Sequence, residues 1–247
     1  MNDRRIVRRA RPLLGTLVEI GVVTIHGAPQ ATVDAVDAAF ARIEALQERL
    51  SRFIDASDIG RFNAAPADAC IDVGDDARAV LRAAAALRDA SDGAFDVTLG
   101  SGTHAWRLDG RGLHKLADRA HIDLGGIAKG HAVNCAVATL EACGVASGWV
   151  NAGGDLRAFG DLAVPIELRD EVAGGVRRFA TIEDGAFATS HREGPDGIVR
   201  HASVAAPRCL WADALTKLVV VTANASHPLL ARFGARGWLH DPRSGIA

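Results

Sequence analysis

Apolar residues recur every three or four positions in several stretches of the chain, and this spacing predicts helices. The clearest stretch is residues 32–50, where the apolar side chains fall on one face of a helix. Residues 75–90 open with two aspartates, which suit a helix N-terminus, and predict a second helix. Residues 127–142 predict a third helix, because their apolar residues also share one face.

Shorter apolar runs predict strands. Residues 17–23 are rich in β-branched side chains and predict the first strand. Residues 211–221 fit a helix or a buried strand, and Asp213 favours a helix that begins there. Residues 226–233 predict a last short helix. Further short strands are predicted at residues 149–151, 156–159, 164–168, 176–182, 186–189 and 198–205, where turn residues separate the apolar runs.

Helices that precede and follow a run of closely spaced strands favour an α+β fold, with a mixed, largely antiparallel sheet and flanking helices. A Rossmann fold is disfavoured, because strands and helices do not alternate and the chain has neither a GxGxxG nor a Walker motif. Residues 51–65 and 96–116 predict loops, since they are rich in turn residues and lack periodic apolar positions. A length of 247 residues fits one large domain or two small ones.

Charge and composition exclude several classes of protein. The formal net charge of -2 argues against nucleic acid as a partner. Five arginines among the first eleven residues are a local exception, which we interpret as a solvated tail or the guard of an edge strand. No apolar run is long enough to span a membrane, and no signal peptide is visible. We therefore expect a cytoplasmic protein, or a periplasmic one whose leader has been removed.

Two glycine-rich turns flank the helix predicted at residues 127–142. The first contains Asp123, Gly125 and Gly126 and leads to Lys129. Backbone N–H groups at a helix start, together with a lysine, suit a phosphate group. An ordinary tight turn with a solvent-facing lysine explains the same residues.

The second glycine-rich turn holds Asn151, Gly153, Gly154 and Asp155. Paired glycines after a strand indicate positive φ or a close approach of backbone. Asp155 could then accept hydrogen bonds from a ribose or from the amides of the turn. A plain hairpin turn capped by Asp155 accounts for the pattern equally well.

A third group is Asp213, Thr216 and Lys217, which share one face if this segment is helical. A carboxylate and a hydroxyl so placed could bind Mg²⁺, which takes few protein ligands. A surface ion pair between Asp213 and Lys217 is the alternative. Weaker candidates combine acids, hydroxyls or histidine with apolar neighbours: Asp96 with Thr98, Thr189 with Ser190, and His201.

Taken in order, these segments resemble the ApbE family, the FAD:protein FMN transferases. Their order and spacing carry the resemblance, which covers residues 14–216. The matching segments are Leu14-Gly15-Thr16, Leu50-Ser51-Arg52-Phe53, Ser57-Asp58-Ile59 with Asn63, Gly93 to Thr98, Ile122 to Gly130, Val150 to Asp155, Ala188-Thr189-Ser190 and Ala212 to Leu215.

The resemblance implies a T-fold-related domain over residues 1–247, either single or made of two closely packed lobes. It implies FAD as substrate and Mg²⁺ as cofactor, with FMN passing to a threonine or serine of an acceptor flavoprotein subunit and AMP released. The catalytic residues that it implies are Asp213, Lys129 and His201. The metal ligands that it implies are Asp213, Thr216 and the carbonyl of Ala128. The implied FAD site comprises Asp96, Thr98, Asp123, Gly125, Gly126, Lys129, Asn151, Gly153, Gly154, Asp155, Thr189 and Ser190.

Three departures from the family pattern bear on activity. Lys217 stands four residues after Asp213, where the family has a hydroxyl, and its ammonium group could take the place of the metal. Asn134 and Cys135 replace an acid and a base. The family's His-Ile-Ile-Asp-Pro-x-Thr-Gly loop is missing, with His201 as its only remnant. Two alternative functions follow: flavin-nucleotide binding without transfer, or hydrolysis of FAD to FMN and AMP.

Overall fold

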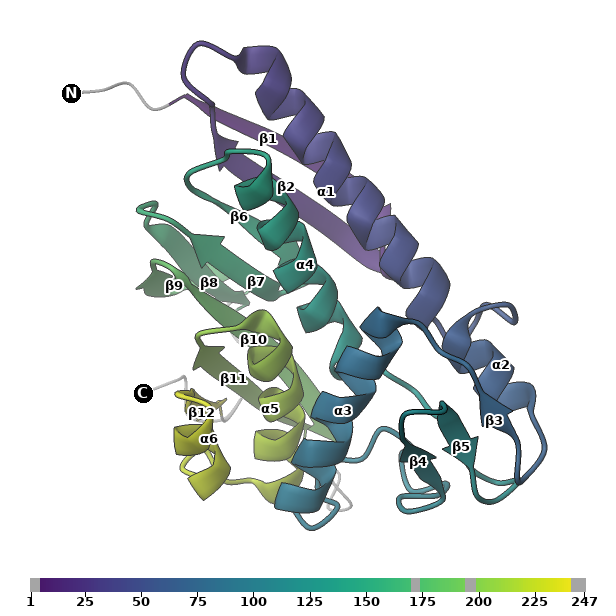
Figure 1. Ribbon diagram of the computed structural model, residues 1–247. Coiled ribbons are helices and arrows are strands. Elements are labelled where there is room, and N and C mark those ends of the chain that lie inside the picture. The colour runs from purple at the N-terminus through teal and green to yellow at the C-terminus, as the bar shows by residue number, and fades with distance from the viewer. Residues whose placement is uncertain (1–4, 170–173, 194–198, 241–247) are drawn as a thin grey trace. The chain divides into compact units, whose positions relative to one another are not determined.

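The computed structural model describes residues 5–169, 174–193 and 199–240, and the chain divides into two compact units (Figure 1). One unit is formed by Met1–Ile43 and Lys129–Ala247, and the other by Glu44–Ala128. We refer to them as the sheet unit and the inserted unit. Whether the chain is one domain with two lobes stays a prediction.

The sheet unit is built on a seven-stranded sheet in which all neighbouring strands are antiparallel. This confirms the predicted α+β class. In spatial order the strands are β1 (Ile6–Leu13), β2 (Thr16–Val23), β6 (Gly148–Ala152), β7 (Asp155–Phe159), β10 (Gly185–Glu193), β11 (Val199–Ala206) and β12 (Arg236–His240).

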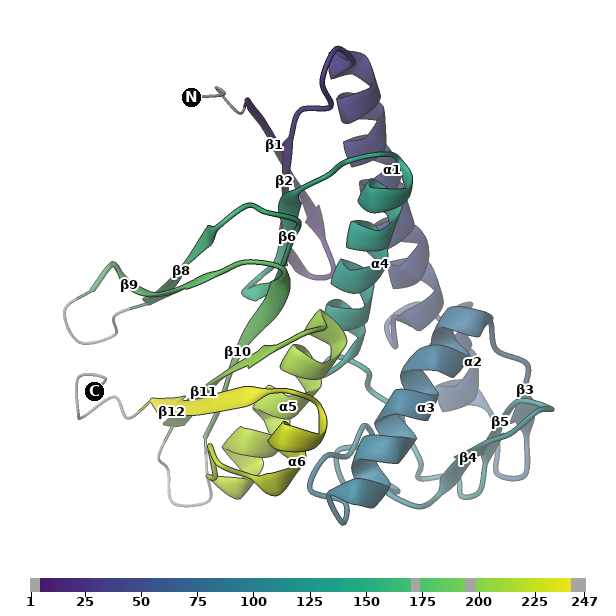
Figure 2. The ribbon, with the colours of Figure 1, turned by 60° about the vertical axis from the view of Figure 1, so that its left-hand side comes forward.

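Helices cover one face of this sheet and a hairpin lies on the other. Helices α4 (Ala128–Ala142) and α5 (Cys209–Thr222) lie over the face seen in Figure 1, and α6 (Pro228–Arg232) follows α5. The hairpin of β8 (Val164–Arg169) and β9 (Val176–Ile182) projects from the opposite side (Figure 2). Its side chains join Leu156 and Phe187 of the sheet in an apolar cluster.

The side chains of strand β6 alternate between the two faces of the sheet. Val150 and Ala152 are fully buried, whereas Trp149 and Asn151 are half-buried. Because successive side chains of a strand point to opposite faces, each pair lies on its own side of the sheet. Trp149 and Asn151 lie on the hairpin side, where they share a groove with β8. Asp155 faces Ala152 in the register of the sheet and therefore lies on the helix side.

The inserted unit contains two helices and a small sheet. Helix α1 (Pro29–Leu50) runs into this unit from the sheet unit, and α2 (Asp58–Ala64) and α3 (Asp75–Ala90) follow. The sheet has the strand order β3 (Cys70–Ile71), β5 (Leu113–Lys115) and β4 (Trp106–Leu108).

The prediction that residues 51–65 and 96–116 are loops was wrong. Residues 51–65 contain α2, whose N-terminus is capped by Ser57 Oγ, 2.8 Å from the Gly60 nitrogen that donates to it. Residues 96–116 contain β4 and β5. Each of these strands has only three residues, which is too short for an alternating pattern to be seen.

Two strands of the large sheet were also missed, and one helix begins earlier than predicted. β1 carries Arg8, Arg9 and Arg11 at the edge of the sheet, where the arginines hide its alternation. β12 has five residues at the other edge. Helix α5 begins at Cys209, so that Asp213 lies in its second turn. No helix in the described ranges is long and apolar enough to cross a membrane.

Candidate functional site

Two lysines and two aspartates meet on the helix side of the sheet; we call this set the charge cluster. Lys129, at the start of α4, donates to Asp155 Oδ2 at the start of β7. Lys217 Nζ donates to Asp213 Oδ1 at 2.6 Å, and both residues lie on α5. The backbone nitrogen of Gly130 donates to Asp213 Oδ2 at 3.0 Å. Both carboxylates are buried, with 1% and 0% of the side chain exposed for Asp155 and Asp213.

The charge cluster depends on close contact between α4 and α5. A Cβ atom on Gly130 would lie 2.3 Å from the carbonyl oxygen of Cys209, so only glycine permits this approach. Asn134 Oδ1 accepts a hydrogen bond from the Cys209 nitrogen at 2.9 Å. This bond satisfies one of the unpaired N–H groups at the start of α5 and fixes the helix against α4.

Burial and neighbouring charges shift the protonation of the charge cluster. Burial and the negative charge of Asp213 raise the pKa of Asp155 to about 6, although Lys129 and Lys217 oppose the shift. Burial alone would lower the pKa of Lys129, but the carboxylates of Asp155 and Asp213 outweigh it and raise that pKa. Asp155 Oδ1 is buried and has no hydrogen-bond partner within the described residues, so it can accept one further proton or donor.

The predicted metal ligands already have protein partners. Asp213 accepts one hydrogen bond on each carboxylate oxygen. Thr216 Oγ1 donates to the Asp213 carbonyl at 2.7 Å and accepts from Lys217 Nζ at 3.2 Å. Mg²⁺ requires oxygen ligands at about 2.0–2.1 Å in near-octahedral geometry. These side chains do not fit a divalent cation while Lys217 lies between them. Ala128 belongs to the inserted unit, and its role as a carbonyl ligand stays a prediction.

A groove of about 560 Å³ lies on the hairpin side of the sheet. Three residues predicted to bind FAD line it: Asn151, Gly154 and Thr189. Trp149 adds an aromatic surface, and its Nε1 donates to Glu19 Oε1 at 3.0 Å. The volume lies within the range of about 300–1,000 Å³ that is usual for small-molecule sites.

The turn between β6 and β7 separates the groove from the charge cluster. Gly153 and Gly154 have φ values of 61° and 101°, which side chains rarely adopt. Asn151 Oδ1 accepts from the Gly154 nitrogen at 2.9 Å and holds the turn. The next residue, Asp155, then points to the helix side. This short turn therefore has predicted ligand-binding residues on both of its sides.

The predicted site residues of the inserted unit organise their own loops. Asp96 accepts hydrogen bonds from Thr98, Gly100 and Thr103. Burial alone would raise the pKa of Asp96, but these bonds outweigh it and lower that pKa. Asp123 pairs with Arg52 at 3.0 Å.

Asp123 also holds the first glycine-rich turn. Its Oδ1 accepts from the Gly125 nitrogen at 2.8 Å, and Gly126 follows in the same turn before α4. The FAD-binding roles of Asp123, Gly125 and Gly126 stay predictions.

Two further candidates lie away from the charge cluster. The ring of His201 stacks on His191, with the ring centroids 5.5 Å apart. His201 and Ala205 lie four residues apart on β11, so their side chains point to the same face of the sheet. Ala205 packs in the apolar cluster on the hairpin side. The structure therefore does not bring His201 to Lys129 and Asp213. Ser190 faces Ala202 in the register and lies on the helix side of the sheet.

Comparison with known proteins identifies the family. The ApbE family model matches residues 14–122 and 107–194, which together form more than half of the chain. The chain belongs to the ApbE family. No curated protein matches the sequence.

Solved structures of ApbE proteins share the fold of this family member. Apo flavinyl transferase ApbE from Pseudomonas stutzeri matches with a TM-score of 0.80 and 23% identity, over 96% of this chain and 91% of that one. The ApbE protein from Thermotoga maritima gives 0.78 and 21%, over 95% and 94%. Flavin transferase ApbE from Vibrio cholerae gives 0.76 and 22%, over 88% and 87%.

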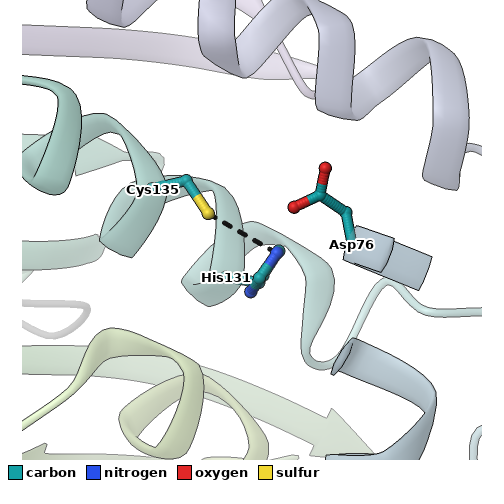
Figure 3. Close-up of side chains that lie close together, drawn as sticks. All are labelled: Asp76, His131 and Cys135. Carbon is teal, nitrogen blue, oxygen red and sulfur yellow. Dashed lines mark hydrogen bonds between the residues drawn. The ribbon is translucent and has the colours of Figure 1, made fainter. Parts of the chain in front are cut away.

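Some contacts near the charge cluster and the groove of this ApbE-family chain were not predicted from the sequence. Asn134 was noted as a departure, but its bond to Cys209 depends on a contact across 75 positions. Trp149 lies two residues before Asn151 in the same strand, so the alternation of side chains could have predicted that both point to the same face. Cys135, the second departure on α4, has its Sγ 3.5 Å from His131 Nε2, one helical turn away (Figure 3).

Proposed function

We propose that the chain is a flavin transferase that moves FMN from FAD to a threonine or serine hydroxyl of an acceptor flavoprotein. The observation that carries the proposal is the buried charge cluster, built from both glycine-rich segments in a chain of the ApbE family. The ammonium groups of Lys129 and Lys217 suit a pyrophosphate, because they can neutralise its negative charge. The groove next to the same turn suits the flavin ring, because Trp149 offers an aromatic face and Asn151 and Thr189 offer polar groups.

The transfer balances as a single displacement. The acceptor hydroxyl oxygen forms a bond to the FMN phosphorus of FAD, and the bond from that phosphorus to the bridging oxygen breaks. AMP leaves with the electron pair of the broken bond. Lys129 would neutralise charge on the pyrophosphate. Asp155 suits the uptake of the hydroxyl proton, since a pKa of about 6 lies close to neutrality.

The proposed transfer has no step that uses Mg²⁺. The implied ligands Asp213 and Thr216 are occupied by protein donors. Mg²⁺ dependence thus stays a prediction from the family resemblance.

The proposal is tested by incubating the full chain with FAD and an extract of the source organism's cells from which flavin has been removed. The extract supplies the acceptor protein. Transfer would appear as a flavin-fluorescent band on a denaturing gel, and mass spectrometry would find an FMN adduct on one hydroxyl. AMP should accumulate in step with the adduct. A Lys129→Met variant should lose the band, whereas the exposed variant Asp55→Asn should retain it.

Two results would contradict this proposal and identify another function. FMN and AMP released without any acceptor would identify an FAD pyrophosphatase. FAD bound tightly but unchanged after long incubation with the extract would identify a flavin-nucleotide-binding protein.

A further inference from the structure

We infer that the ammonium group of Lys217 is the built-in cation of the charge cluster, so that FAD binding needs no divalent metal. The inference rests on the proposed function, because it concerns how the same site receives a pyrophosphate. It makes Lys217 a binding residue for the pyrophosphate, held in place by Asp213.

The position of the ammonium group carries the inference. Lys217 Nζ lies 2.6 Å from Asp213 Oδ1 and 3.2 Å from Thr216 Oγ1. It therefore sits between the two side-chain oxygens that a cation at this place would use. The other oxygen of Asp213 is held by the Gly130 nitrogen, so the carboxylate has no oxygen left without a donor. A divalent ion could bind between Asp213 and Thr216 only after Lys217 had moved away.

The balance of charge points the same way. The charge cluster contains two ammonium groups, of Lys129 and Lys217, and two carboxylates, of Asp155 and Asp213. The four charges sum to zero when all are ionised. A divalent ion added to this set would face both ammonium groups at short range in a poorly solvated site, where repulsion between like charges is strong. The two carboxylates are thus already balanced by protein cations, without a metal ion.

Burial separates this pair from an ordinary surface ion pair. Asp213 has 0% of its side chain exposed, while 27% of the Lys217 side chain is exposed. The Asp213 carboxylate is thus buried inside the sheet unit, whereas the Lys217 side chain remains accessible to solvent and to a ligand. An exposed pair four residues apart on a helix would leave both groups in water.

The first test uses metal alone. Mn²⁺, a paramagnetic substitute for Mg²⁺, is titrated into the metal-free full chain and followed by electron paramagnetic resonance. We expect no stoichiometric site in the parent chain and one new site in Lys217→Thr, which replaces the ammonium group with a hydroxyl. Val221→Thr, at an exposed position of the same helix, is the matched control and should gain no site. One Mn²⁺ bound per parent chain and lost in Asp213→Asn would overturn the inference, with or without FAD.

The second test measures FAD binding by calorimetry in EDTA and in Mg²⁺. The parent chain should bind equally in both, within twofold, and Lys217→Arg should behave likewise. Lys217→Thr should lose at least tenfold affinity in EDTA and recover it in Mg²⁺. Parent binding that requires Mg²⁺ would overturn the inference. Failure of the parent chain to bind FAD in either condition would count against the proposed function instead, and the Mn²⁺ titration would still decide the role of Lys217.

Should Lys217→Thr fail to fold, FAD binding by the parent chain in EDTA and in Mg²⁺ still decides the inference, because it is measured without any variant. Lys217→Gln then supplies the comparison, since it keeps a long side chain with a donor but removes the charge.

Discussion

Lys217 Nζ donates a 2.6 Å hydrogen bond to Asp213 Oδ1, one helical turn earlier on α5. The pair is part of the sheet unit's interior, because Asp213 is fully buried and accepts a second bond from Gly130 on α4. One contact therefore ties the internal geometry of α5 to its packing against α4. It also determines which charged groups lie at this place.

Removing only Asp213 from the Asp213–Lys217 pair should destabilise the sheet unit more than replacing both residues with apolar ones. Asp213→Ala leaves the Lys217 ammonium group without its carboxylate, and we expect a loss of roughly 2 kcal/mol or more in the free energy of unfolding. The double variant Asp213→Leu with Lys217→Met should lose less, because it buries no unpaired charge. Urea unfolding followed by circular dichroism measures both. A double variant that is less stable than the single one would contradict this account.

Protonation of Asp155 should make stability depend on pH in the acidic range. Its pKa is 3.8 when unfolded and about 6 when folded. The protonated form therefore stabilises the fold below about pH 4, and this contribution is lost as the pH rises through about 6. Relative to Asp155→Asn, the parent should lose roughly 3 kcal/mol of unfolding free energy between about pH 4 and 7. Unfolding curves at intervals of one pH unit give this difference, and parallel pH profiles for the two proteins would refute it.

Gly130 should tolerate no side chain. A Cβ atom there would lie 2.3 Å from the Cys209 carbonyl oxygen, which belongs to backbone and cannot rotate away. We expect Gly130→Ala to destabilise the fold by roughly 1–3 kcal/mol and to weaken FAD binding, because α4 and α5 must separate. Gly110→Ala is the matched control, since a Cβ atom there meets nothing within 4 Å. Equal melting temperatures for the two variants would argue against this close approach of α4 and α5.

Asp96 should be needed for the stability of the inserted unit. Its carboxylate collects hydrogen bonds from Thr98, Gly100 and Thr103, and Asp96→Ala would leave those donors without their acceptor. We expect a loss of about 1–3 kcal/mol. Because these bonds lower its pKa, the contribution of Asp96 is lost as the pH falls. Hydrogen exchange over Glu44–Ala128 measures the change, and the exposed variant Asp55→Ala should match the parent.

Elements with a strong local period were predictable from the sequence. The helix predicted at 127–142 is found at Ala128–Ala142, and the strands predicted at 164–168 and 176–182 are found at Val164–Arg169 and Val176–Ile182. Short or heavily charged elements were not. Strand β3 has two residues, and β1 carries arginines on both of its faces, so neither shows a usable alternation.

The residue types of the candidate site were also visible in the chain, but their partners were not. Lys129 and Asp155 were each noted in a separate glycine-rich turn, yet their ion pair spans 26 positions. Only the assembled sheet shows on which of its faces each predicted residue lies, because successive side chains of a strand alternate between the faces. Asp155 lies on the helix side, whereas Asn151 and Thr189 lie in the groove on the other side.

Local patterns in the chain were sufficient for the α+β class, the main helices and the ordered segments of the ApbE family, because each depends on residues close together in sequence. They left open whether Asp213 holds a metal ion or a lysine. The folded chain pairs it with Lys217 and with Gly130, which is 83 positions away. Burial of the carboxylate depends on how α5 packs against α4, a long-range contact that no local spacing encodes.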